Sequence, residues 1–133
     1  MILPGNESKT LPIIIYEEMR GTIVIKGRSI SPEVESYFAD FTPYLDECVS
    51  KNPMDLKIDI DLEYFNTKTA KIMIKMLDTL KKVVETGFKV DVTWFYEADD
   101  EDMYDAGLDY EELSKLKFNF VVSWNKNKAI CVF

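Results

Sequence analysis

The sequence predicts an α+β domain of two layers, in which a mixed β-sheet has helices packed on one face. An N-terminal β-hairpin is followed by β-α-β units. Apolar and polar residues alternate along three segments, at 56–65, 90–96 and 118–124. This period of two is typical of strands with one face on the core and the other in water. Helical patterns separate these strands, an order that favours right-handed crossovers between parallel neighbours.

The hairpin is predicted from two runs rich in β-branched residues, at 11–17 and 22–26. Residues 18–21 separate the two runs, and Gly21 stands near the expected turn. Short apolar runs joined by a glycine-containing turn are typical of paired antiparallel strands. We therefore expect the hairpin to add an antiparallel strand to the sheet.

Residues 31–33 read Ser-Pro-Glu and predict the start of a helix. Serine is a favoured N-cap, proline fits the first helical position, and a carboxylate is favourable in the first turn. The helical spacing of apolar residues continues to Cys48, but Pro43 lacks the N–H that a helix interior needs. We expect Pro43 to kink the helix or to restart it, with Thr42 as a second cap.

The segment 68–85 predicts a long amphipathic helix, and Gly87 is expected just beyond its end because glycine readily adopts the left-handed conformation. The predicted core stripe of this helix consists of Met73, Met76, Leu77, Leu80 and Val84. A third helix is expected within 99–116, with Leu113 and Leu116 directed inwards.

The composition favours one domain whose partners are proteins. The 133 residues suffice for a single domain, residues 1–133, with its own core. The net charge of −8 argues against nucleic acid and anionic lipid, which attract clustered Lys and Arg. No segment approaches the ~20 apolar residues of a membrane helix, and no secretory signal is evident. We expect a cytoplasmic protein with no membrane insertion.

The sequence contains no histidine, which removes the commonest general base and the commonest metal ligand. The cysteines, Cys48 and Cys131, form no CxxC motif, and free thiols are the expected state in a reducing compartment. We therefore expect a protein that is not an enzyme and has no catalytic residue, no cofactor and no metal.

Asp59, Asp61 and Glu63 lie on one face of the predicted strand 56–65, at steps of roughly 7 Å. Such a row of oxygens could hold a divalent cation if a loop supplied further ligands. Solvated carboxylates on the open face of the sheet, partly neutralised by lysines, are the favoured interpretation.

The acidic run 97–102 invites comparison with a calcium-binding loop, but Tyr104 stands where that loop needs a glycine. Two interpretations stay open. The run is either an exposed loop whose carboxylates stabilise the start of the third helix, or a docking surface for a protein.

Asn66, Thr67 and Thr69 stand where the strand 56–65 meets the helix 68–85. Asn and Thr are favoured at helix starts, so capping alone would explain them. A helix N-terminus also offers unpaired N–H groups and the positive end of the macrodipole, which would stabilise a phosphate on a hydroxyl there. The local chemistry leaves both roles open.

Five short segments, in order along most of the chain, form a specific set: Tyr64-Phe65-Asn66-Thr67 leading to Lys71, Val92–Glu97, Asp99–Met103, Ala106-Gly107 and Lys117–Phe120. This set resembles the SiaC family of bacterial regulatory phosphoproteins. The resemblance implies a fold similar to the STAS domains of anti-sigma factor antagonists, and a role in partner switching.

In that family, the threonine after the junction Asn is phosphorylated by a serine/threonine kinase of the histidine-kinase-like ATPase fold. A PP2C-type phosphatase reverses the modification. The unphosphorylated form binds an output protein, such as a diguanylate cyclase that makes cyclic-di-GMP for biofilm control. The resemblance places the modified position at Thr67, and Thr69 is a second candidate.

The junction and the resemblance together predict a partner-binding surface, which a phosphate would disrupt by placing charge in the interface. The residues expected on this surface are Asn66, Thr67, Lys68, Lys71, Ile72 and Met76. One rival is a constitutive protein-binding domain of the same fold without a phosphorylation switch. Another is an enzyme that uses the carboxylates of the open sheet face.

Overall fold

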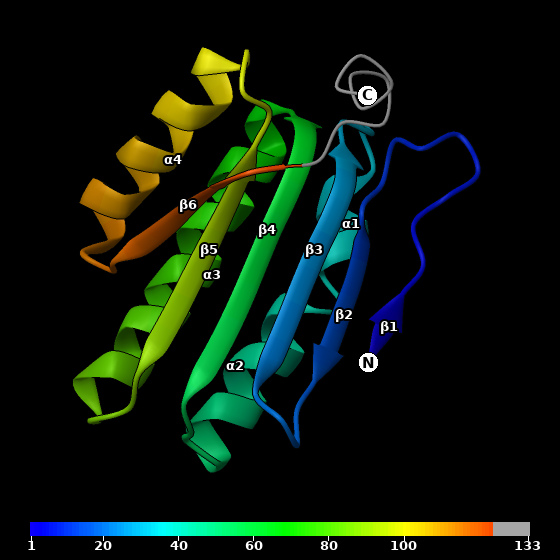
Figure 1. The fold of residues 1–133 in the computed structure, drawn as a ribbon. Coiled ribbons are helices and arrows are strands. Elements are labelled where there is room, and N and C mark those ends of the chain that lie inside the picture. Colours follow the sequence, from blue (N-terminus) through cyan, green and yellow to red (C-terminus); the bar gives the residue numbers. More distant parts are fainter. Residues whose placement is uncertain (124–133) are drawn as a thin grey trace, which may run out of the picture.

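The computed structural model describes residues 1–123 and shows one six-stranded sheet with helices on one face (Figure 1). The strands are β1 (Ile2–Leu3), β2 (Ile13–Glu17), β3 (Thr22–Ser29), β4 (Leu56–Phe65), β5 (Val90–Tyr96) and β6 (Phe118–Val122). The helices are α1 (Val34–Phe38), α2 (Thr42–Lys51), α3 (Thr67–Glu85) and α4 (Glu101–Ser114).

The strands lie in the sheet in the same order as in the sequence. The pairs β1–β2 and β2–β3 are antiparallel, whereas β3–β4, β4–β5 and β5–β6 are parallel. The predicted fold class, a mixed sheet that begins with a hairpin and continues in β-α-β units, is confirmed.

The core lies between the sheet and the helices because alternate strand residues point to the same face. Register places Ile25 opposite Ile60, and Ile60 opposite Trp94, and all three are buried. The neighbouring positions Lys26 and Asp61 pair with each other on the opposite face. The amphipathic strand pattern therefore determines which face the helices cover.

The predicted interruption at Pro43 is confirmed, because α1 ends at Phe38 and α2 begins at Thr42 with the proline in its first turn. The capping role expected for Thr42 is wrong. The N-cap position of α2 is Phe41, and the Thr42 hydroxyl donates to the Phe38 carbonyl at 3.3 Å. Ser31 accepts a hydrogen bond from the Glu33 N–H, which stabilises the turn before α1.

Two residues that were predicted to point inwards, Val84 and Leu113, are exposed, so these predictions were wrong. Val84 is 41% exposed, and Val83 completes the buried stripe of α3, three residues after the buried Leu80. Leu113 is 64% exposed, because the buried positions of α4 follow a line at helical spacing that ends at Ser114. The third residue expected to point inwards, Leu116, is buried after the end of α4.

The ends of the sheet differ from expectation. The pattern did not predict β1, which has two residues and pairs with Ile14 and Ile15 of β2. Strand β6 ends at Val122, and Trp124 lies outside the described residues, as does Cys131. A two-residue strand carries too little alternation to be recognised in sequence.

Gly107 allows α4 to approach the sheet closely. A Cβ at this position would lie 2.6 Å from atoms of the Trp94 indole and 2.8 Å from the Phe120 ring. The indole cannot readily move, because its N–H donates to the Met103 carbonyl at 2.9 Å within the core. Glycine is therefore required here by packing, although it weakens a helix intrinsically.

We expect Gly107→Ala to destabilise the protein. Alanine should gain about 1 kcal/mol in helix propensity, but overpacking against a fixed ring typically costs about 1–3 kcal/mol. Urea unfolding measures the sum. Asp105→Ala, at an exposed position of the same helix, is the control and should change stability by less than about 0.5 kcal/mol. A more stable Gly107→Ala protein would contradict this packing account.

Candidate functional site at the start of helix α3

A β-bulge precedes the junction between β4 and α3. Gly27 pairs with Leu62 and the next residue of β3, Arg28, pairs with Tyr64, so Glu63 is the extra residue on β4. Tyr64 is 57% exposed, whereas Phe65 packs against the Trp94 ring. The bulge thus shifts the alternation by one residue just before the chain enters the helix.

Asn66 is the N-cap of α3 and connects three segments of the chain. Its Oδ1 accepts from the Thr69 backbone N–H at 2.9 Å, as an N-cap side chain should. Its Nδ2 donates to the Ser31 carbonyl at 3.1 Å, and its backbone N–H donates to the Ser29 carbonyl at 3.0 Å. These bonds hold the start of α3 against the end of β3 and the loop before α1.

Thr69 lies inside this network and is completely buried, with 0% exposure. Its Oγ1 lies 2.7 Å from the Ser29 hydroxyl, 3.0 Å from the Ser29 carbonyl and 2.9 Å from Asn66 Oδ1. The Thr69 hydroxyl therefore serves packing and hydrogen bonding. A modifying enzyme could reach it only if the helix start opened.

Thr67 is the first residue of α3 and is exposed. Within residues 1–123, its hydroxyl makes no hydrogen bond that would have to break before modification. The first turn of the 19-residue helix contains no acidic residue, and the exposed Lys68 and Lys71 follow. Helix dipole and lysines together favour an anion at this position.

Lys68 contributes to the contact between α3 and the α1 region. Its Nζ donates to the Pro32 carbonyl at 3.4 Å and lies 4.0 Å from the Glu35 carboxylate. Both side chains of this ion pair are largely exposed, so the pair adds little stability. Lys68 therefore remains available to an anion or to a partner.

The predicted contact surface needs one correction. Met76 does not belong to it, because this side chain is 2% exposed and packs in the core under α3. Ile72 is partly buried against the same core, so only part of its side chain is accessible. Asn66 is half-buried, and Thr67, Lys68 and Lys71 are exposed.

The carboxylates of β4 lie on the open face, as predicted. Burial raises the pKa of Asp61, an effect that the opposite charge of Lys26 reduces. No group of three or more potential ligands within residues 1–123 is arranged to hold a metal ion.

The acidic run 97–102 contributes to helix capping, since Asp100 accepts from the Met103 N–H at 3.0 Å at the start of α4.

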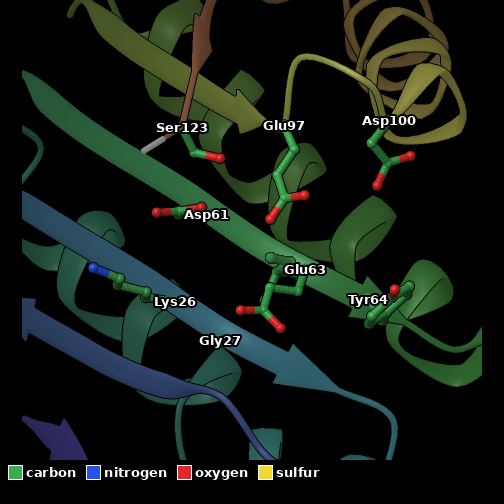
Figure 2. A pocket seen from close by; sticks show the side chains of 9 residues that line it. Lys26, Gly27, Asp61, Glu63, Tyr64, Glu97, Asp100 and Ser123 are labelled. Atoms are coloured by element: carbon green, nitrogen blue, oxygen red, sulfur yellow. The ribbon is translucent and has the colours of Figure 1, made fainter. Parts of the chain in front are cut away.

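The structure also forms a hollow of about 290 Å³ on the open face, which sequence reasoning missed (Figure 2). The side chains around it come from β3, β4, the loop after β5 and the end of β6: Lys26, Asp61, Glu63, Tyr64, Glu97, Asp100 and Ser123. Neighbouring strand ends bring these residues together from distant parts of the chain, and no local pattern signals that arrangement. We refer to this site as the acidic hollow.

The mixed sheet with helices on one face defines an α+β domain. Residues 6–123 match the family model for SiaC family regulatory phosphoproteins. The chain therefore belongs to this family. None of the helices within the described part of the chain is long and apolar enough to cross a membrane.

The chain is also similar to a curated protein and to solved structures. An uncharacterized protein of Pseudomonas aeruginosa (strain UCBPP-PA14) is 24% identical over 110 residues, which cover 83% of this chain and 86% of the relative. The fold resembles a chain in the crystal structure of the diguanylate cyclase SiaD in complex with its activator SiaC from Pseudomonas aeruginosa. That match has a TM-score of 0.80 and 20% identity, and covers 92% of this chain and 99% of the other.

The crystal structure of apo-SiaC from Pseudomonas aeruginosa is similar to the same degree. Its TM-score is 0.78 at 22% identity, with 93% of this chain and 98% of that chain covered. At these identities the structural likeness shows the fold, whereas family membership follows from the family model.

We expect the Ser29 and Thr69 hydroxyls to be energetically coupled. Thr69→Val should cost about 1–3 kcal/mol, because it leaves the buried Ser29 hydroxyl without its partner. Ser29→Ala should cost less, since the Thr69 hydroxyl keeps its other acceptors. The double variant should be no less stable than Thr69→Val alone. Urea unfolding of all four proteins measures the coupling, and strictly additive costs would contradict it.

Proposed function

We propose that this protein is a non-catalytic signalling regulator that switches partners through reversible phosphorylation of Thr67. The observation that carries this proposal is the contrast between two threonines of one helix turn. Thr67 presents an exposed hydroxyl at the N-terminus of α3 that makes no hydrogen bond within residues 1–123, whereas Thr69 is buried and hydrogen-bonded. Membership of a family of regulatory phosphoproteins supports the same function.

A phosphate on Thr67 would be stabilised within this chain and unfavourable in an interface. It would add nearly two negative charges at the positive end of the α3 macrodipole, close to Lys68 and Lys71 in sequence. A partner that covers this surface would have to desolvate that charge, which is costly without a matching cation. The unphosphorylated form is therefore the binding form.

The surface that we assign to the output partner consists of Asn66, Thr67, Lys68 and Lys71, with the accessible part of Ile72. A diguanylate cyclase is the output partner that we propose, because a structurally similar SiaC is described as the activator of the cyclase SiaD. The product of such a cyclase, cyclic-di-GMP, would link this regulator to biofilm control. A kinase of the histidine-kinase-like ATPase fold and a PP2C-type phosphatase complete the proposed switch.

A constitutive binding domain is the alternative that one observation favours. The Asn66–Thr69 network by itself accounts for the structure of the helix start, so Thr67 needs no modification for the fold. Under this alternative, Thr67 substitutions would change binding only by altering the contact itself. The charge of the new side chain would then matter no more at this position than at other places on the interface.

We expect Thr67→Ala to bind the cyclase as well as the unmodified protein does and to escape control by the kinase. Thr67→Glu should weaken binding by about tenfold or more, which corresponds to about 1.4 kcal/mol. The control is Ser50→Glu, which adds the same charge at an exposed residue of α2, beside the C-terminal part of α3 and thus at the opposite end of that helix from Thr67. Isothermal titration with the purified cyclase measures the affinities.

This experiment distinguishes the phosphorylation switch from the constitutive binding domain. Weakening by Thr67→Glu but not by Ser50→Glu supports a charge-controlled interface at the start of α3. A Thr67→Glu protein that binds as tightly as the unmodified protein would contradict the proposal.

A further inference from the structure

The outer face of helix α3 is basic, although the chain as a whole is acidic. The helix contains five lysines and two acidic residues, which gives it a formal charge of +3 in a chain of net charge −8. Both acidic residues, Asp78 and Glu85, belong to its second half. The first half, residues 67–77, contains Lys68, Lys71 and Lys75, and all three are exposed. This half of α3 is therefore a positive surface on an acidic protein.

Most lysines of this helix have no acidic partner within the described residues. Lys68 lies 4.0 Å from Glu35, and the other lysines of α3 form no ion pair within residues 1–123. Helix α4 packs beside α3 and carries six carboxylates and no basic residue. None of these carboxylates pairs with a lysine of α3 in this part of the chain. The positive charge of α3 is thus available to another molecule.

An exposed apolar side chain, Ile74, lies among these lysines and is 41% exposed. At 3.6 residues per turn, the positions i, i+4 and i+7 follow one face of a helix. Thr67, Lys71 and Ile74 occupy these positions, and Lys75 lies beside them. An apolar side chain surrounded by charged ones matches the anatomy of a protein interface, which has an apolar centre and a polar rim.

The neighbours of α3 limit what can bind to this face. The helix lies between α4 on one side and α1 and α2 on the other (Figure 1). Glu35 of α1 approaches Lys68, and Tyr110 of the acidic α4 donates to the Ala70 carbonyl at 3.4 Å. The stretch from Lys68 to Lys75 spans only about 10 Å. A nucleic acid duplex or an anionic membrane would place further negative charges over these acidic neighbours, whereas a narrow acidic segment of a protein would not.

We propose that the output partner docks an acidic segment on the first half of α3. Ile74 is the apolar anchor of this contact, and Lys71 and Lys75 pair with carboxylates that the segment presents one helical turn apart. This inference rests on the proposed function and deepens it, because it names the chemistry of the partner's segment and a further contact residue.

The proposed contact also explains how a phosphate would act. Thr67 precedes Lys71 by one helical turn, the spacing at which opposite charges on a helix attract each other. A phosphate on Thr67 would therefore neutralise Lys71 and repel the carboxylates of the partner. Docking and regulation thus depend on the same lysine.

Charge reversal tests the pairing with carboxylates. We expect Lys71→Glu with Lys75→Glu to weaken binding of the purified cyclase by about tenfold or more, since like charges then face each other. The control is Lys81→Glu with Lys82→Glu, the same charge change in the second half of the same helix. At 0.15 M salt, where the screening length is about 8 Å, this control should change the affinity by less than about threefold. Isothermal titration measures all four proteins that this comparison and the unmodified chain require, together with Thr67→Glu.

A matched pair of apolar residues tests the anchor. Ile74→Ala should weaken binding by about fivefold or more, as truncation of a central interface residue does. Val84→Ala is the control, because Val84 is also 41% exposed and lies about 15 Å further along α3. It should bind the cyclase as tightly as the unmodified protein. Urea unfolding of both variants shows that neither loses the fold.

A carbodiimide, which joins a carboxylate to a lysine amine as an amide, identifies the partner's segment directly. We expect peptide mapping to find Lys71 or Lys75 joined to one acidic stretch of the cyclase. Cross-links confined to Lys81 and Lys82, or to lysines outside α3, would overturn docking on this face.

The affinities distinguish this inference from the switch on which it rests. Weakening by the Lys71–Lys75 and Ile74 variants but not by Thr67→Glu would support the docking surface and refute the switch. Weakening by Thr67→Glu alone would leave the switch standing and overturn the acidic docking segment. A cyclase that does not bind the unmodified protein would overturn both, because both name it as the partner.

Discussion

The hydrogen bonds of Asn66 are the constraint on which the proposed partner surface depends. One side chain caps α3 through its oxygen and ties that helix to the Ser31 carbonyl through its nitrogen. Asn66 lies directly between β4 and α3, so its hydrogen bonds fix the direction in which α3 leaves the sheet. The same network takes the Thr69 hydroxyl into the core and leaves Thr67 outside. Under the proposed switch, the structural role and the regulatory role belong to different residues of one helical turn.

This division explains how a surface can be modified without loss of the fold. The hydroxyl that stabilises the junction is inaccessible, and the accessible hydroxyl contributes no hydrogen bond within the described residues. A phosphate on Thr67 would therefore meet a preformed helix N-terminus with its cap already satisfied, so that the added charge acts mainly on partners. The acidic hollow on the open sheet face, which Tyr64 helps to line, is a second and electrostatically distinct surface.

The sequence predicted most of the architecture, because alternation and helical spacing report burial directly. It could not predict the bulge at Glu63, which depends on pairing between two strands, or the acidic hollow, whose walls meet only in the folded sheet. Met76 was placed both in the core stripe of α3, from its helical spacing, and on the contact surface, and its burial shows that only the core placement was correct. Local chemistry did not distinguish Thr67 from Thr69, since both suit a helix start, and only the family resemblance put Thr67 first. Burial separates the two residues.

The intact mass of the protein isolated from its native cells, with peptide mapping of any heavier species, tests the central claim most directly. The account predicts a fraction that carries one phosphate, located on Thr67, and an unmodified fraction that grows when the phosphatase is active. A single unmodified mass under all growth conditions would contradict the switch. A phosphate on the buried Thr69 would contradict the division of roles between the two threonines.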